Sequence, residues 1–204
     1  MKMRLLFLIL LVSLTACAKP TSTKTLAASD MFFNKLSNYC GKAFAGKLTA
    51  FNESDTKSFS GAAIMHVRSC SENEIRVPFH VGEDHSRTWV ITKIETGLRL
   101  KHDHRHKDGS EDKLTQYGGD TVTAGSATRQ EFPADAFSKA MFERDGMKVS
   151  MENTWAVEVN DNEVFAYELR RPNRHFRVEF DLSKPVANPP APWGSEKNNP
   201  FENR

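Results

Sequence analysis

The sequence predicts a mainly β protein: a single antiparallel β-barrel, lipocalin-like, with a short N-terminal helix and one further helix. Apolar and polar residues alternate with a period of two in several segments, which is typical of half-buried strands. Short turns rich in Asn, Asp, Gly and Pro separate these segments, as they do in hairpins. The body at residues 29–183 is long enough to build one core of its own. A β-sandwich is the alternative architecture.

The chain begins with the pattern of a secretory signal peptide. Lys2 and Arg4 precede an apolar run from Leu5 to Val12 that is too short to span a membrane stably. The next residues, Leu14-Thr15-Ala16-Cys17, resemble the lipobox of bacterial lipoproteins. This resemblance implies a cleaved signal peptide at residues 1–16 and a lipidated, polar tether at residues 17–28. The alternative is an ordinary signal peptide with an incidental cysteine.

The lipoprotein resemblance also implies a location. Cys17 would carry acyl chains such as palmitate, and each buried CH₂ contributes about 0.8 kcal/mol to membrane binding. Ala18 stands where an Asp would imply retention in the inner membrane, so the resemblance implies an outer-membrane anchor with the body in the periplasm.

The charge balance argues against a nucleic-acid partner. The full chain carries 28 basic and 26 acidic residues, and removal of the signal peptide with Lys2 and Arg4 leaves 26 of each sign. Without a basic excess, composition indicates no electrostatic binding to nucleic acid. The membrane contact is expected through the N-terminal lipid.

The cysteines indicate an oxidising compartment. With Cys17 assigned to lipid, Cys40 and Cys70 remain, and an even remainder in the periplasm predicts one disulfide. Their spacing lacks the C-x-x-C pattern of redox motifs. A pair of free thiols is the alternative.

The body is expected to begin with a helix and continue as strands. Ser29-Asp30 opens a segment in which Phe32, Phe33, Leu36 and Tyr39 share one helical face, and Gly41 ends it. About nine strands are then expected. Their segments are 42–51, 62–70, 75–81, 86–94, 97–106, the hairpin 155–159 with 164–169, and 176–182.

Four remaining segments are assigned from their proline, glycine and turn residues. Residues 133–142 are expected to form the second helix, with Pro133 near its start. The glycine pair in the segment 117–121 indicates a loop, and the segment 170–174 indicates a turn. The tail at residues 184–204 is rich in proline and is expected to be extended.

The segment "LRLKHDHRHKDGSED", residues 98–112, holds the most informative pattern. Side chains alternate across a strand, so Leu98, Leu100, His102, His104 and His106 share one face. Every residue between them is charged, so the histidines are expected to continue the inward apolar face toward one end of the barrel.

Two kinds of site fit this histidine row. Imidazoles two residues apart on a strand lie roughly 7 Å apart at Cα, so His102, His104 and His106 could hold Zn or Cu. Alternatively, the row forms part of a pocket for a small apolar or amphipathic ligand. The expected lining residues are His66, Leu98, Leu100, Trp155, Phe165 and Tyr167. A third reading is purely structural, with the imidazoles hydrogen-bonded inside the fold.

No catalytic motif is evident. The chain has no G-x-S-x-G, P-loop or dinucleotide fingerprint, and it has no zinc-protease or deaminase motif, so an enzyme is not indicated. Several stretches, including "VPFHVGEDHSRTWVIT", "YGGDT" and "PPAPWG", resemble a group of uncharacterised bacterial secreted proteins. That resemblance implies an envelope location and transfers no site residue. A non-enzymatic envelope structural or assembly protein therefore remains an alternative function.

Overall fold

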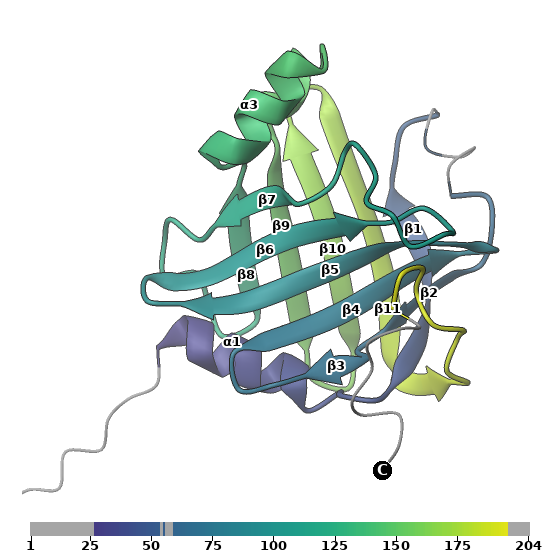
Figure 1. Cartoon of the computed structure of the whole chain (residues 1–204). Helices are drawn as coiled ribbons and strands as arrows, with labels where there is room; N and C mark the ends of the chain where they lie inside the picture. The colour runs from purple at the N-terminus through teal and green to yellow at the C-terminus, as the bar shows by residue number, and fades with distance from the viewer. Residues whose placement is uncertain (1–26, 54, 56–58, 196–204) are drawn as a thin grey trace, which may run out of the picture.

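Eleven β-strands form one antiparallel sheet that curls into a nearly closed barrel in the computed structural model (Figure 1). The structure describes residues 27–53, 55 and 59–195, so the predicted signal peptide, Cys17 and most of the tether lie outside the described residues. The strand order is β7-β6-β5-β4-β2-β1-β11-β10-β9-β8, and the short strand β3 pairs with β4. The mainly β class and the antiparallel barrel are confirmed.

Most of the secondary-structure elements are strands that follow one another in sequence. The first half of the chain contains α1 Ala28–Ser37, β1 Ala43–Ala50, β2 Ala63–His66, β3 Ser69–Cys70, β4 Glu74–Val81, β5 Asp84–Ile94 and β6 Gly97–His104. The second half contains β7 Tyr117–Asp120, β8 Arg129–Pro133, α3 Ala136–Arg144, the 3-10 helix η1 Lys148–Glu152, β9 Thr154–Asn160, β10 Val164–Arg171 and β11 Arg174–Val186.

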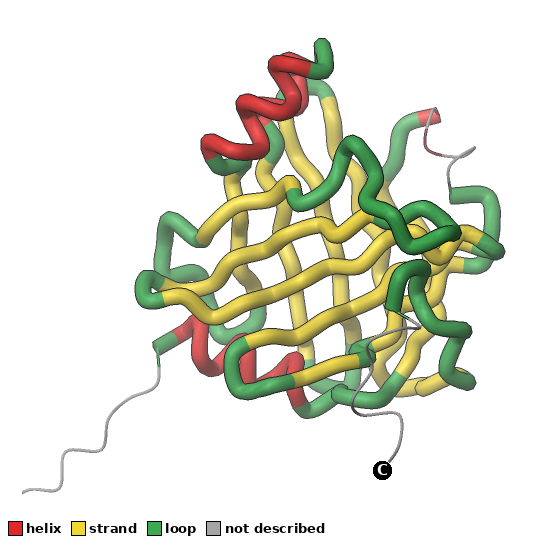
Figure 2. The backbone as a smooth tube through the Cα atoms, in the orientation of Figure 1, coloured by secondary structure: helices red, strands yellow, loops and turns green. Residues whose placement is uncertain are grey.

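The two ends of the barrel are covered differently. At one end lies α1, which buries Phe32, Phe33 and Leu36 against the core, as the helical spacing predicts (Figure 1). At the opposite end lies α3, with α1 and α3 drawn in red on either side of the yellow strands in Figure 2. The interior of the barrel is therefore closed by apolar packing near α1, and the site must be sought toward α3.

The strand β7 corrects a sequence prediction. The segment around Gly118 and Gly119 was expected to be a loop, but it pairs with β6, with Lys101 opposite Gly118 and Leu100 opposite Gly119. A Cβ atom on Gly119 would lie 1.8 Å from the carbonyl oxygen of Pro133 in β8. Only a residue without a side chain permits this approach, so the glycine pair brings the two edges of the sheet together.

Hydrogen bonds complete the seam between β7 and the chain after β8. The Asp135 amide donates to the Gly118 carbonyl at 2.9 Å. The Ser138 hydroxyl accepts from the Gly118 amide at 2.7 Å and donates to the Gly118 carbonyl at 2.9 Å. Because Ser138 is fully buried, these bonds satisfy edge groups that water does not reach.

The disulfide is confirmed. Cys40 follows α1 and Cys70 ends β3, and the two are bonded with their Cα atoms 6.2 Å apart. The bond ties the helix at the closed end to the edge of β4, which pairs with β3.

The tail begins later than the sequence indicates. Strand β11 continues to Val186, which pairs with Ala43 of β1, so residues 184–186 belong to the barrel. Further on, Pro192 is buried and the Trp193 amide donates to the carbonyl of His85 at 3.0 Å. The described part of the tail therefore packs on the body.

Candidate functional site

A cavity of about 420 Å³ lies inside the barrel at the end covered by α3 and η1. Phe142 of α3 and Met147 and Ser150 near η1 contribute to its cover. The volume falls in the usual range for small-molecule sites, which is about 300–1,000 Å³. The barrel interior is thus packed near α1 and open to a ligand near α3.

Aromatic side chains form most of the inner wall. The rings of Trp89 and Tyr167 stack with centroids 4.4 Å apart, and the ring of Phe79 also stacks on Trp89, with centroids 4.8 Å apart. Trp155 and Phe176 complete this wall from β9 and β11. Stacked rings resist rotation, so the wall is a preformed apolar surface.

His102 lies in this wall with both ring nitrogens engaged. Its Nδ1 is 3.0 Å from the carbonyl oxygen of Tyr117, and its Nε2 is 2.7 Å from the hydroxyl of Tyr167. A carbonyl only accepts, so Nδ1 carries the proton and Nε2 accepts from the Tyr167 hydroxyl. Burial lowers the pKa of His102 to about 3, so the imidazole is neutral at physiological pH.

The three predicted histidines do not converge. His104 lines the cavity and its Nε2 is 3.2 Å from the Tyr117 hydroxyl, but His106 lies beyond the end of β6, is exposed, and faces Asp112 at 3.8 Å. Across residues 27–53, 55 and 59–195, no group of three His, Cys, Asp or Glu side chains could hold a metal ion. The zinc or copper site is not supported, because β6 ends before the third histidine can turn inward.

The other predicted lining residues divide into three groups. Trp155 and Tyr167 line the cavity, as expected. Leu98, Leu100 and Phe165 face inward but are buried in the core below it. His66 is not among the residues that line this cavity, and its neighbour Met65 points into the core.

Three arginines at the mouth were missed. Arg87, Arg171 and Arg174 line the cavity where the inward rows of β5, β10 and β11 end. The alternation of side chains along a strand, which predicts the inward face of the histidines, also predicts these arginines. Each lies two residues from an inward-facing apolar residue on the same strand: Arg87 from Trp89, Arg171 from Leu169, and Arg174 from Phe176. Arg171 and Arg174 lie in the segment 170–174, which was expected to form a turn. Arg171 is instead the last residue of β10 and Arg174 the first of β11, so only Pro172 and Asn173 separate the strands.

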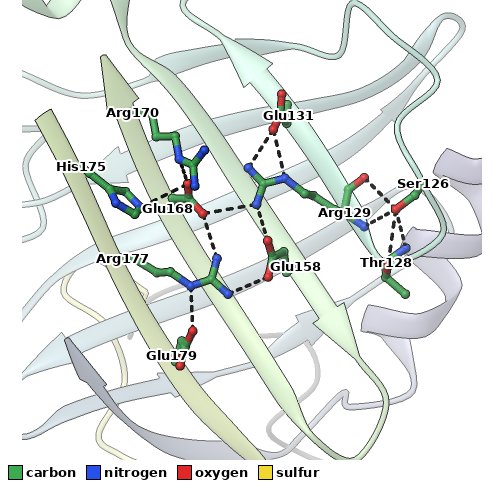
Figure 3. Close-up of polar contacts among 10 residues, drawn as sticks. All are labelled: Ser126, Thr128, Arg129, Glu131, Glu158, Glu168, Arg170, His175, Arg177 and Glu179. Atoms are coloured by element: carbon green, nitrogen blue, oxygen red, sulfur yellow. Dashed lines mark hydrogen bonds and ion pairs between the residues drawn. The ribbon is translucent and has the colours of Figure 1, made fainter. Parts of the chain in front are cut away.

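A second polar cluster lies on the outer face of β8–β11 (Figure 3). At its centre is Glu168, which is 1% exposed and pairs with Arg177 at 2.8 Å, Arg129 at 3.2 Å and Arg170. The same two arginines, Arg177 and Arg129, also bind Glu158.

The charges in this outer cluster neutralise one another. Burial alone would raise the pKa of Glu168, but the hydrogen bond from Arg177 and the charge of Arg129 bring it below its ordinary value. Because its carboxylates and guanidinium groups are mutually paired, we read this cluster as a structural tie between four strands.

Comparison with family models, with curated proteins and with solved structures gave no match. None of the helices in the described part of the chain has the length and apolar character needed to cross a bilayer. The functional argument for this protein therefore rests on the geometry of the cavity.

Proposed function

We propose that this protein is a lipid-anchored envelope protein whose barrel binds a small apolar or amphipathic molecule. The observation that carries the proposal is the aromatic cavity of about 420 Å³ in a barrel that is otherwise densely packed. A binding site needs a preformed apolar space with a few polar groups, and this cavity offers Trp89, Trp155 and Phe176 beside His102 and Tyr167.

Ligand binding can be measured through the cavity itself. Trp89 and Trp155 line it, so a bound molecule should change the intrinsic fluorescence of the purified body, residues 27–204. We expect an environment-sensitive apolar dye, 1-anilinonaphthalene, to bind with one site per chain, and quenching of tryptophan emission to report the same affinity.

A cavity-filling variant distinguishes this site from surface adsorption. Leu169→Trp places an indole in the cavity and should weaken dye binding at least tenfold. Val122→Trp adds the same side chain at a position that is 76% exposed and should leave binding unchanged. Equal binding by both variants would show that the dye does not enter the barrel and would contradict the proposal.

The lipid anchor is tested separately in cells. The full chain expressed in a Gram-negative host with an alkyne-tagged palmitate should be labelled and should fractionate with the outer membrane, whereas Cys17→Ser should lose both properties. A variant with Cys40→Ser and Cys70→Ser keeps Cys17 and should keep the label. If the wild-type protein is not labelled and is released in soluble form, the lipoprotein proposal is wrong. The ligand-binding proposal would be unaffected by that result.

A further inference from the structure

The arginines at the cavity mouth differ in what neutralises them. Arg174 forms a bidentate pair with Asp55, with Nη1 2.5 Å and Nη2 2.6 Å from the two carboxylate oxygens. Arg87 donates from Nη1 to Asp84 at 2.6 Å. Each of these two cations therefore carries its counter-charge within the fold.

Arg171 has no such partner. Its Nη1 donates to the amide oxygen of Asn153 at 3.0 Å, and no carboxylate among residues 27–53, 55 and 59–195 lies within ion-pair distance of it. Asp112, the carboxylate that lines the cavity, accepts a hydrogen bond from the Leu114 amide at 2.7 Å and faces His106, so it does not pair with Arg171.

The surroundings of Arg171 make this lack of a partner costly. The side chain is half-buried, and burial together with the nearby charge of Arg174 lowers the pKa of Arg171, although the charge of Asp55, which is paired with Arg174, acts in the opposite direction. A desolvated cation beside another cation is unfavourable unless an anion joins it. Asn153, which is 5% exposed, holds the guanidinium at the mouth, so the charge cannot simply swing out to solvent without breaking that bond.

The deeper titratable groups of the cavity offer no positive charge to an anion. His102 is neutral, and its one N–H already donates to Tyr117. The hydroxyl of Tyr167 donates to His102, and burial raises the pKa of both Tyr117 and Tyr167, so these groups stay uncharged. Among the cavity-lining residues, the cationic partners for an anionic group on a ligand therefore lie at the mouth.

We infer that the ligand is an anionic amphiphile whose carboxylate or phosphate group pairs with Arg171 at the mouth while its apolar part lies on Trp89 and Trp155. The inference rests on the proposed function, since it specifies the chemistry of a molecule bound in that cavity. A guanidinium group binds planar carboxylate and phosphate oxygens in two parallel hydrogen bonds, which suits both headgroups.

The test compares ligands that differ only in charge. Dodecanoate, dodecyl phosphate and dodecanol share one chain, and 1-naphthaleneacetate and 1-naphthaleneethanol share one ring system, so flexible and rigid apolar parts are both covered. Each is titrated against bound 1-anilinonaphthalene on wild type, Arg171→Met and Arg171→Lys. Arg99→Met is the control, because it removes an arginine on the outside of β6, where Arg99 pairs with Asp120.

We expect wild type and Arg99→Met to bind each anion at least tenfold more tightly than the alcohol with the same apolar part. Arg171→Met should abolish this difference because it weakens binding of the anion and leaves binding of the alcohol unchanged. Arg171→Lys should restore part of the difference. Carboxylate and phosphate arms identify which headgroup is preferred.

The two proposals fail in different ways. If alcohols and anions bind equally, and Arg171→Met leaves both unchanged, the inference about the anion is wrong while the proposed ligand-binding function stands. If dye binds wild type and Leu169→Trp equally and no compound displaces it, the cavity is not a binding site and both proposals fall.

Discussion

The Nε2 atom of His102 lies 2.7 Å from the hydroxyl oxygen of Tyr167, and this hydrogen bond joins β6 to β10 across the interior of the barrel. Both side chains are buried, with His102 3% and Tyr167 7% exposed. The bond links strands that are not neighbours in the sheet, so it holds the two walls of the cavity at a set distance. The width of the cavity therefore depends on this hydrogen bond, and we expect the polar contacts in the cavity wall to contribute to the stability of the fold.

Tyr167→Phe should therefore destabilise the protein. The substitution keeps the ring stacked on Trp89 but leaves the Nε2 acceptor of His102 buried without a donor, which costs about 1–3 kcal/mol. Urea unfolding of the purified body at pH 7 measures the change. Tyr117→Phe removes a hydroxyl that faces His104, a less buried partner, and should cost less; the opposite order would contradict this account of the interior.

Mild acid should weaken the fold through its buried histidines. Burial lowers the pKa of His102 to about 3, whereas the unfolded chain titrates near 6.5. The neutral imidazole thus stabilises the native state fully above pH 6.5, and this stability is lost as pH falls toward the folded pKa. For His102 the loss approaches about 1.4 kcal/mol per pH unit. His66, His80 and His104, each with its pKa lowered to about 4, add to it in the same direction.

The acid effect can be separated from carboxylate protonation by its pH window. Unfolding free energies measured from pH 6.5 to 5 lie above the range in which Glu158 and Glu168 affect stability, since a glutamate of the unfolded chain titrates at about 4.3 and both pKa values are lower still in the folded protein. His102→Gln should give a shallower slope in this window. A flat wild-type profile between pH 6.5 and 5 would show that the histidines do not oppose protonation.

Gly119→Ala should open the barrel seam. Its methyl group would meet the Pro133 carbonyl at 1.8 Å, which backbone atoms cannot accommodate without separating β7 from the chain after β8. We expect a loss of at least about 3 kcal/mol, the range of severe overpacking. Gly146→Ala, where no atom lies within 4 Å, should show only the strain of its positive φ, about 1–2 kcal/mol. Hydrogen exchange should localise the Gly119→Ala effect to the β7 amides.

Glu168→Gln should destabilise the outer face of the barrel. The change removes the central carboxylate and leaves Arg129, Arg170 and Arg177 crowded around a neutral amide, at a cost of about 3 kcal/mol. Glu131→Gln alters a carboxylate whose side chain is 53% exposed and should cost less than about 1 kcal/mol. Thermal unfolding of both variants, with dye binding measured in parallel, tests whether the cluster supports stability without shaping the cavity.

Much of the site follows from strand parity. Trp155, Tyr167 and His102 face inward because each continues an alternating apolar row, and the same rule applies to Arg87, Arg171 and Arg174. Parity fails where a strand ends, which is why His106 is exposed, and it fails for His66, where the inward position belongs to Met65. Strand ends depend on pairing partners distant in the chain, so local periodicity does not locate them.

The class of fold, the pairing of Cys40 with Cys70, and the inward face of most strands can be predicted from the residues alone, because periodicity and cysteine count are local or countable properties. Three features emerge only in the folded chain: Gly118 and Gly119 close the sheet, a cavity remains beside Trp89 and Trp155, and Arg171 faces that cavity without a carboxylate partner among the described residues. These features depend on how side chains from distant strands fill or leave space, which is a property of packing in three dimensions.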